Sequence, residues 1–255
     1  MLRSRRRREQ LFPSKHAIQK ESQTMSVRTR ILIDRIAQDI GEDPSTWRVP
    51  RGYPGVACSV LDSIYSTGNH YSGVKGLVSR YAALRGADSP KELLDGPAEL
   101  IATVEAAGSA EGFADLTNNR WRAWARNTAP LKSHVALEAA RLLDEAGLTS
   151  REEVQRAFED QSVRQSSEIS TAWKRLPGQR SGLTWHYFLM LNGLPGVKAD
   201  RMIRRFVTRA LDLPRTISAV EASQLVEAAA SEIGVGYSTL DHAIWRFEAR
   251  GETGP

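Results

Sequence analysis

The residues whose types and spacing first suggest chemistry lie between Asn192 and Lys198, where Asn-Gly is followed by Leu-Pro-Gly-Val-Lys. Asn192 and Gly193 favour the left-handed backbone at the end of a helix, and Pro195 and Gly196 favour a tight turn. A helix that starts after such a turn offers unpaired backbone N–H groups and the positive end of its dipole. The turn is therefore predicted to bind a phosphate group; the alternative is a short loop between two core helices with a solvated basic face. The residues predicted to face that phosphate are Gly193, Leu194, Gly196, Val197 and Lys198.

Basic side chains surround this turn and gather again in an earlier segment. From Lys174 to Arg215 the chain has nine Lys or Arg and two acids, a local excess of +7. The stretch 118–134 holds four basic residues and no acid, whereas 138–160 carries a charge of −4. Clusters of one sign are typical of a protein that binds a polyanion, although a solvated surface can also be patchy. The further residues predicted to contact DNA are Arg120, Arg122, Lys132, Arg201, Arg204 and Arg205.

The elements that must position these residues are predicted to be helices almost throughout. Ser89-Pro90-Lys91-Glu92 has the pattern of a capping box, so one helix is predicted to start at Pro90. No stretch alternates with period two for long enough to form a strand, and the predicted fold class is therefore all-α. Apolar residues recur at helical spacing in 27–40, 56–65, 71–84, 97–107, 131–146, 183–191, 198–211, 219–233 and 239–249.

The composition limits the class of protein. With 255 residues, 41% of them hydrophobic and 25% charged, the chain is expected to form a soluble globular protein with a sizeable core. No apolar run is long enough to cross a membrane. The single cysteine, Cys58, excludes an intramolecular disulfide and a cysteine-built zinc or iron–sulfur site, which fits a reducing cytoplasm. The five histidines show no metal-ligand spacing, so no metal site is predicted.

The net charge of +5 comes from residues 1–24, because the remainder has 28 basic and 28 acidic groups. This segment lacks the apolar stretch of a secretory signal. It is predicted to be either a disordered basic arm that adds nonspecific DNA affinity or sequence upstream of a true start at Met25.

The turn Leu194-Pro195-Gly196-Val197 and its flanking helices resemble the helix-hairpin-helix motif of the DNA glycosylase superfamily, of the endonuclease III type. The resemblance extends in pattern over most of residues 27–248, and the chain would be a divergent member without an iron–sulfur cluster. It implies a single domain over 25–255 that folds as a two-lobed helical bundle. One lobe, about 70–200, would carry the hairpin, and the other would combine 25–69 with 201–250.

A second segment, Leu61 to Tyr71, resembles the early part of this family in which an apolar helix ends in a short polar turn. In the family this turn contributes to the base pocket or to the cleft that faces DNA. The residues that the resemblance places near a substrate are Tyr65, Ser66, Thr67, Asn69, His70 and Tyr71.

The family also uses a catalytic Asp at the start of a helix. Cleaving an N-glycosidic bond builds oxocarbenium character, which a fixed carboxylate stabilises, and the same group could orient the attacking water. Asp200 resembles the family pattern but follows the hairpin directly, whereas the family usually inserts a helix. Glu221 stands at the usual distance, although it also completes a capping box with Ser218, and an acid such as Asp200 is favoured in a first helical turn in any case. Asp200 is the first candidate and Glu221 the second, with Asp212 and Asp241 behind them.

Two departures from the family affect the hairpin. Lys198 stands where the family usually has a second glycine, and it is predicted to contact a phosphate itself. No lysine occupies the position of the nucleophile of strand-nicking members, so a Schiff-base mechanism is not supported. The resemblance allows a monovalent cation at the hairpin and implies no other cofactor.

The sequence thus predicts a cytoplasmic, monomeric protein that binds double-stranded DNA, is not bound to a membrane, and uses no small-molecule cofactor. Its activity would be that of a monofunctional DNA glycosylase. Two alternatives stay open: a helix-hairpin-helix DNA-binding protein without catalysis, and an all-α interaction protein that does not touch DNA.

Overall fold

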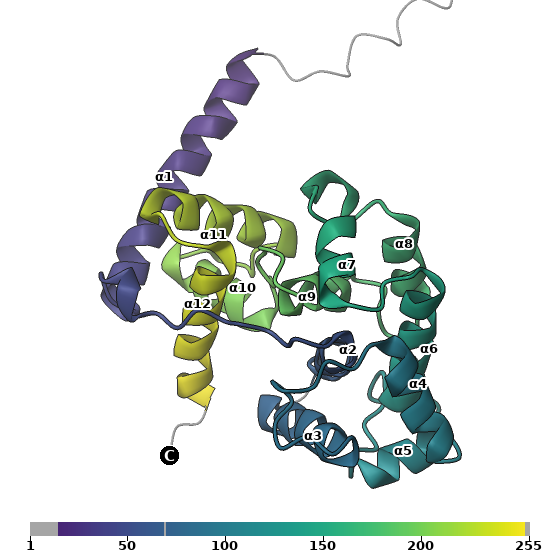
Figure 1. Ribbon diagram of the computed structural model, residues 1–255. Coiled ribbons are helices and arrows are strands. Elements are labelled where there is room, and N and C mark those ends of the chain that lie inside the picture. Colours follow the sequence, from purple (N-terminus) through teal and green to yellow (C-terminus); the bar gives the residue numbers. More distant parts are fainter. Residues whose placement is uncertain (1–14, 69, 253–255) are drawn as a thin grey trace, which may run out of the picture. The chain divides into compact units, whose positions relative to one another are not determined.

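A computed structural model describes residues 15–68 and 70–252 (Figure 1). Within these ranges the chain forms twelve α-helices and two short 3-10 helices, and it contains no strand. The all-α prediction is confirmed. The arginines of the basic segment 1–14 and the predicted pocket residue Asn69 lie outside the described residues.

The described residues divide into two compact units. Unit 1 consists of the chain up to Arg48 together with the chain from Ala199 onward, and unit 2 is the continuous segment Val49–Lys198. The segment 49–69, which the sequence analysis places with the N-terminal helix, belongs to unit 2. The physical reason is that helix α2 (Val56–Tyr65) packs against four other helices of that unit.

Unit 2 is built around α2, in which every residue is buried. Its most extensive contacts are with α3 (Tyr71–Leu84), α6 (Lys132–Glu145) and α9 (Leu183–Leu191), which fits the sequence, because nearly all of 56–65 is apolar or small. The remaining helices of unit 2 are α4 (Pro97–Ala106), α5 (Ala110–Leu116), α7 (Arg151–Ala157), η2 (Gln161–Val163) and α8 (Glu168–Arg175).

An aromatic cluster fixes α9 in the core of unit 2. The ring of Trp185 lies 5.5 Å from Trp173, 5.6 Å from Phe188 and 5.1 Å from Phe158, measured between ring centroids. The indole N–H of Trp185 donates to the carbonyl of Arg164 at 2.6 Å, so its polar group is also satisfied. The turn that follows α9 therefore starts from a rigid support.

The helix predicted from Pro90 is absent. Residues 89–92 form a turn, with the Glu92 N–H donating to the Ser89 carbonyl at 3.0 Å. Residues 93–96 have no regular structure, and the Asp95 carbonyl accepts the N–H of Ala57 at 2.9 Å in the first turn of α2. Packing against α2 thus overrides the local capping pattern.

Unit 1 contains both ends of the described chain. Its elements are α1 (Lys15–Asp39), η1 (Pro44–Thr46), α10 (Arg201–Ala210), α11 (Ala219–Ile233) and α12 (Tyr237–Glu252). Helix α1 packs against α10 and α11, and α12 packs against the same two helices. Helix α1 begins at Lys15 rather than at Val27, so it extends into the segment 1–24, and both interpretations of that segment stay predictions. No glycine or proline interrupts the chain there, and a helix can continue through it.

The predicted hairpin is divided between the units. Helix α9 and the turn up to Lys198 belong to unit 2, whereas α10 belongs to unit 1.

Candidate functional site

The turn after α9 ends the helix in the predicted manner. Gly193 has a φ of 92°, in the left-handed region, and its N–H donates to the Met190 carbonyl at 2.9 Å. The N–H of Leu194 donates to the Leu189 carbonyl at 3.1 Å. These two amides close the C-terminus of α9, so in this structure they are already bonded and do not face a ligand.

Side chains of unit 2 hold the carbonyl groups of the turn. Gln155 donates to the Asn192 carbonyl at 2.8 Å, and Arg164 donates to the Pro195 carbonyl at 2.9 Å. The carbonyl oxygens of Asn192 and Pro195 therefore already accept hydrogen bonds, and the monovalent cation at the hairpin stays a prediction.

Lys198 points into unit 2. Its Nζ donates to Ser66 Oγ at 3.0 Å and lies 3.6 Å from the centroid of the Tyr187 ring. Lys198 is buried, as are Gly196 and Val197. The predicted phosphate contact by Lys198 would require its ammonium to leave these partners.

A polar cluster around the buried carboxylate of Asp62 lies beside this lysine. Oδ2 of Asp62 accepts the hydroxyl of Tyr53 at 2.8 Å and that of Tyr71 at 3.0 Å. Burial raises the pKa of Asp62, while hydrogen bonds from the tyrosines, including Tyr187, and the positive charge of Lys198 act against this rise. The structure thus brings Ser66 and Tyr71, predicted for the substrate pocket, together with Lys198 of the turn.

Asp62, Tyr53 and Tyr187 were not among the predicted site residues. One signal for Asp62 is present in the sequence, because it is the one charged residue in the otherwise apolar or small stretch 56–65. A charge within a buried helix requires partners. The partners of Asp62 include Tyr53 and Tyr187. These two tyrosines are far apart in sequence, so no local pattern predicts that they lie close together.

Lys132, predicted to contact DNA, is also buried. Its Nζ donates to the carbonyls of Ile64 at 3.0 Å, Tyr65 at 3.2 Å and Thr67 at 2.7 Å, and to the Thr67 hydroxyl. Burial and the positive charge of Lys198 lower the pKa of Lys132 to about 7. In this structure Lys132 satisfies the C-terminal carbonyls of α2.

The other predicted pocket and DNA-binding residues of unit 2 are not in one place. Tyr65 is fully buried, whereas His70 is exposed at the start of α3. Arg120 and Arg122 are exposed, the first paired with Asp115 and the second donating to the Ala129 carbonyl at 2.6 Å.

The two leading candidates for a catalytic carboxylate, both in unit 1, have structural partners. Oδ1 of Asp200 accepts the N–H of Met202 at 2.8 Å and that of Ile203 at 3.3 Å, so it caps α10. Glu221 pairs with Arg28 in the first turn of α11.

The two remaining carboxylate candidates differ in exposure. Asp212 is exposed after α10 with a φ of 48°, and Asp241 is buried in α12. The catalytic role of all four acids stays a prediction.

Helix α10 carries a row of arginines on the face opposite its apolar side. Met202, Ile203, Phe206 and Val207 are buried, as its predicted amphipathic pattern requires. The arginines line a groove of about 440 Å³, here called the α10 groove. Its lining residues are Arg201, Arg204, Arg205, Thr208, Arg209, Asp212, Leu213 and Thr216.

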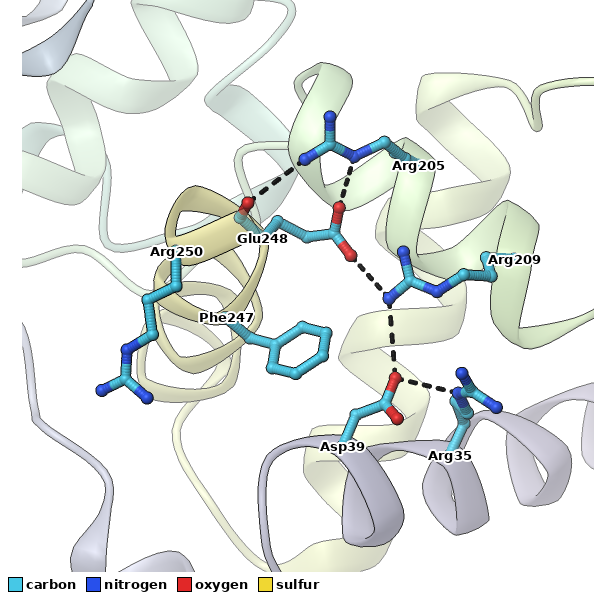
Figure 2. Close-up of a pocket in the computed structure, with 7 residues that line it drawn as sticks. All are labelled: Arg35, Asp39, Arg205, Arg209, Phe247, Glu248 and Arg250. Carbon is cyan, nitrogen blue, oxygen red and sulfur yellow. Dashed lines mark hydrogen bonds and ion pairs between the residues drawn. The ribbon is translucent and has the colours of Figure 1, made fainter. Parts of the chain in front are cut away.

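A second groove, of about 680 Å³, adjoins it and is here called the α12 groove. Figure 2 shows its side chains, which come from α1, α10 and α12. Arg205 and Arg209 line both grooves. The complete lining is Arg35, Asp39, Arg205, Arg209, Phe247, Glu248 and Arg250.

No group of three or more His, Cys, Asp or Glu side chains is arranged to hold a metal ion in the part of the chain that the structure describes. No described helix has the length and apolar character needed to cross a membrane.

Comparison with known proteins gives the family of this all-α protein. Residues 30–249 match the model of a family described as a domain of unknown function, DUF8548. Because the match covers most of the chain, the protein belongs to this family. No curated protein and no solved structure gives a significant match.

Proposed function

We propose that this protein binds double-stranded DNA and acts in base excision, in the manner of the helix-hairpin-helix proteins that its sequence resembles. The observation that best supports the proposal is the α10 groove, which is lined by four arginines and a single acid. Guanidinium groups bind phosphate through charge-assisted hydrogen bonds, and such contacts provide most of the sequence-independent affinity for DNA.

Arg201 is the most suitable residue of this groove for a phosphate contact. It is exposed and occupies the first turn of α10, where the helix dipole also favours an anion. Lys198, which precedes it, is buried against Ser66 and Tyr187. The contact predicted for the hairpin is therefore assigned mainly to the arginines of α10.

Fluorescence anisotropy of a labelled duplex across a salt series tests the binding proposal. The logarithm of the association constant should fall linearly with the logarithm of salt concentration, and Arg201→Gln should reduce this slope by roughly one. Arg141→Gln is the matched control, because Arg141 is half exposed in an acidic segment and pairs with Glu138. Absence of binding at low salt, or equal slopes for both variants, contradicts the proposal.

Base excision requires its own experiment. Duplexes that each contain one damaged or modified base are incubated with the protein and then treated with hot alkali, which cleaves abasic sites. Cleavage of at least one duplex is expected, and the Asp200→Asn and Glu221→Gln variants identify the carboxylate. If no duplex is cleaved while binding persists, the catalytic part of the proposal is wrong.

One observation favours a second candidate, a DNA-binding protein without catalysis. Asp200 caps α10 and Glu221 pairs with Arg28, so both leading carboxylates have structural roles. This candidate predicts salt-sensitive binding and no cleavage of any duplex. A cytoplasmic location and a role in DNA repair belong to the proposal as well, and the buried free thiol of Cys58 is consistent with a reducing compartment.

A further inference from the structure

We propose that the α12 groove of unit 1 is a binding site for a compact phosphate group with at least two negative charges, such as a terminal phosphate or a pyrophosphate. This site lies beside the α10 groove, and it would function whether or not the protein binds duplex DNA.

Positive and negative side chains alternate along the α12 groove. Figure 2 shows a row in which arginines and carboxylates alternate: Arg205, Glu248, Arg209, Asp39 and Arg35. Nη2 of Arg209 lies 2.6 Å from Oε1 of Glu248 and 3.5 Å from Oδ2 of Asp39. Nε of Arg35 lies 2.9 Å from the same oxygen of Asp39.

The carboxylate side chains of the α12 groove are less exposed to solvent than its arginine side chains. The side chain of Glu248 is 3% exposed and that of Asp39 is 16% exposed, whereas those of Arg35, Arg205 and Arg209 are 39%, 43% and 41% exposed. The carboxylates therefore lie behind the guanidinium groups. An anion entering from solvent meets mainly positive charge.

Contacts within unit 1 hold Arg205 and Arg209 in position without a ligand. Arg205 bonds to the carboxylate of Glu248 and, at 3.2 Å, to its main-chain carbonyl. The guanidinium carbon of Arg209 lies 5.4 Å from the Phe206 ring and 5.8 Å from the Phe247 ring, measured to the centroids. Since these contacts restrict the side chains, binding costs less conformational entropy than it would with free arginines.

The geometry of the guanidinium group leaves donors for a ligand. Each guanidinium has five N–H groups in a planar fork. The ion pair between Arg35 and Asp39 engages Nε of Arg35, and the ion pairs of Arg209 engage Nη2. The groove as a whole has four arginines and two acids, an excess of two positive charges that matches a phosphate dianion.

The alternative is that the same row of charges only ties α1, α10 and α12 together. Partly exposed ion pairs contribute little to stability by themselves, so such a role is also physically reasonable. The two interpretations differ in one respect. A purely structural row does not bind an added anion.

Isothermal titration of the full-length protein with inorganic pyrophosphate separates them. We expect saturable binding with one site, weakened about tenfold by Arg35→Gln and also by Arg250→Gln, since each substitution removes one cation from the lining. Asp39→Asn should act in the opposite direction and strengthen binding, because it removes a negative charge. Arg30→Gln is the control, since Arg30 lies on the same helix but pairs with Glu232 outside the groove.

Two further measurements complete the test. Circular dichroism checks that each variant is folded, and sodium chloride at equal ionic strength checks for general screening. A 5′-phosphorylated duplex compared with its unphosphorylated form distinguishes a nucleic-acid end from a free phosphate compound. The proposal is overturned if pyrophosphate produces no more heat than the salt control, or if Arg35→Gln and Arg30→Gln bind it equally.

Discussion

Individual charged residues of unit 2 are turned inward, and each has partners that make its burial tolerable. Asp62 receives the hydroxyl groups of Tyr53 and Tyr71, and Lys132 donates to the carbonyls at the end of α2. A buried charge without such partners would cost several kcal/mol, about as much as a small domain's whole margin of stability. At the scale of the residue, burial therefore determines what a titratable group can do.

His186 gives a prediction at this scale. Burial, together with the positive charge of Arg164, lowers its pKa to about 4, which is below the value near 6.5 of an unfolded chain. The unfolded state then binds a proton that the folded state does not, so stability is lost as pH falls from about 6.5 towards 4. The loss should be on the order of 3 kcal/mol by the end of this range.

Urea unfolding at several pH values checks the His186 prediction. His186→Gln removes the titrating group and should flatten the profile between pH 6.5 and 4. His134→Gln is the control, because the side chain of His134 is 44% exposed and pairs with Glu111. The control should keep the slope of the unmodified protein, and His186→Gln should keep a part of it, since burial also lowers the pKa of His242. Equal profiles for the two variants would show that His186 does not carry the effect.

At the scale of the element, α2 organises unit 2 through its two ends. Its first turn receives the Asp95 carbonyl, and its last carbonyls receive the ammonium of Lys132. Gly55 precedes the helix because a Cβ there would lie 2.6 Å from the Leu93 carbonyl oxygen and 2.7 Å from that of Asp95. These contacts link α2 to two segments distant in sequence.

Substitution of Lys132 tests whether its role is structural. Lys132→Met keeps much of the side-chain volume but leaves the carbonyls of Ile64, Tyr65 and Thr67 without their donor, and we expect a loss of roughly 2–4 kcal/mol of unfolding free energy. Lys91→Met is the control, because Lys91 is exposed. Chemical denaturation gives the comparison. If Lys132→Met instead binds DNA more weakly and keeps its unfolding free energy, Lys132 contacts DNA as the sequence predicts.

At the scale of the whole molecule, the two units differ in how the chain builds them. Unit 2 is one continuous segment, 49–198, and the large hydrophobic cluster of buried residues lies entirely inside it. Unit 1 needs both ends of the chain, because α1 packs against α10 and α11. The units should therefore respond differently to being separated.

The isolated segment 49–198 is expected to fold by itself, since its core is complete. It should show helical circular dichroism and a cooperative thermal transition. The isolated segment 199–252 should not, because it lacks α1. A fragment 49–198 that binds a hydrophobic dye and melts without cooperativity would contradict this view of the two units.

The sequence by itself determined the fold class and most of the helices. The bounds of α2 and α3 agree with the prediction, and Asn192-Gly193 ends α9 as expected. Periodic apolar residues, glycine and capping pairs act over a few neighbouring residues, so a local pattern is sufficient to recognise them. The helix wrongly predicted at Pro90 shows the limit of such patterns.

Only the tertiary structure decided where the charges point. Lys132 and Lys198 look like phosphate contacts in the sequence, yet both are buried and bonded to groups more than 60 positions away along the chain. Arg35, Arg209 and Glu248 meet from three helices, and no local spacing relates them. Whether a basic residue binds a ligand or an internal carbonyl depends on which distant segment covers it, and that is a property of the packed chain.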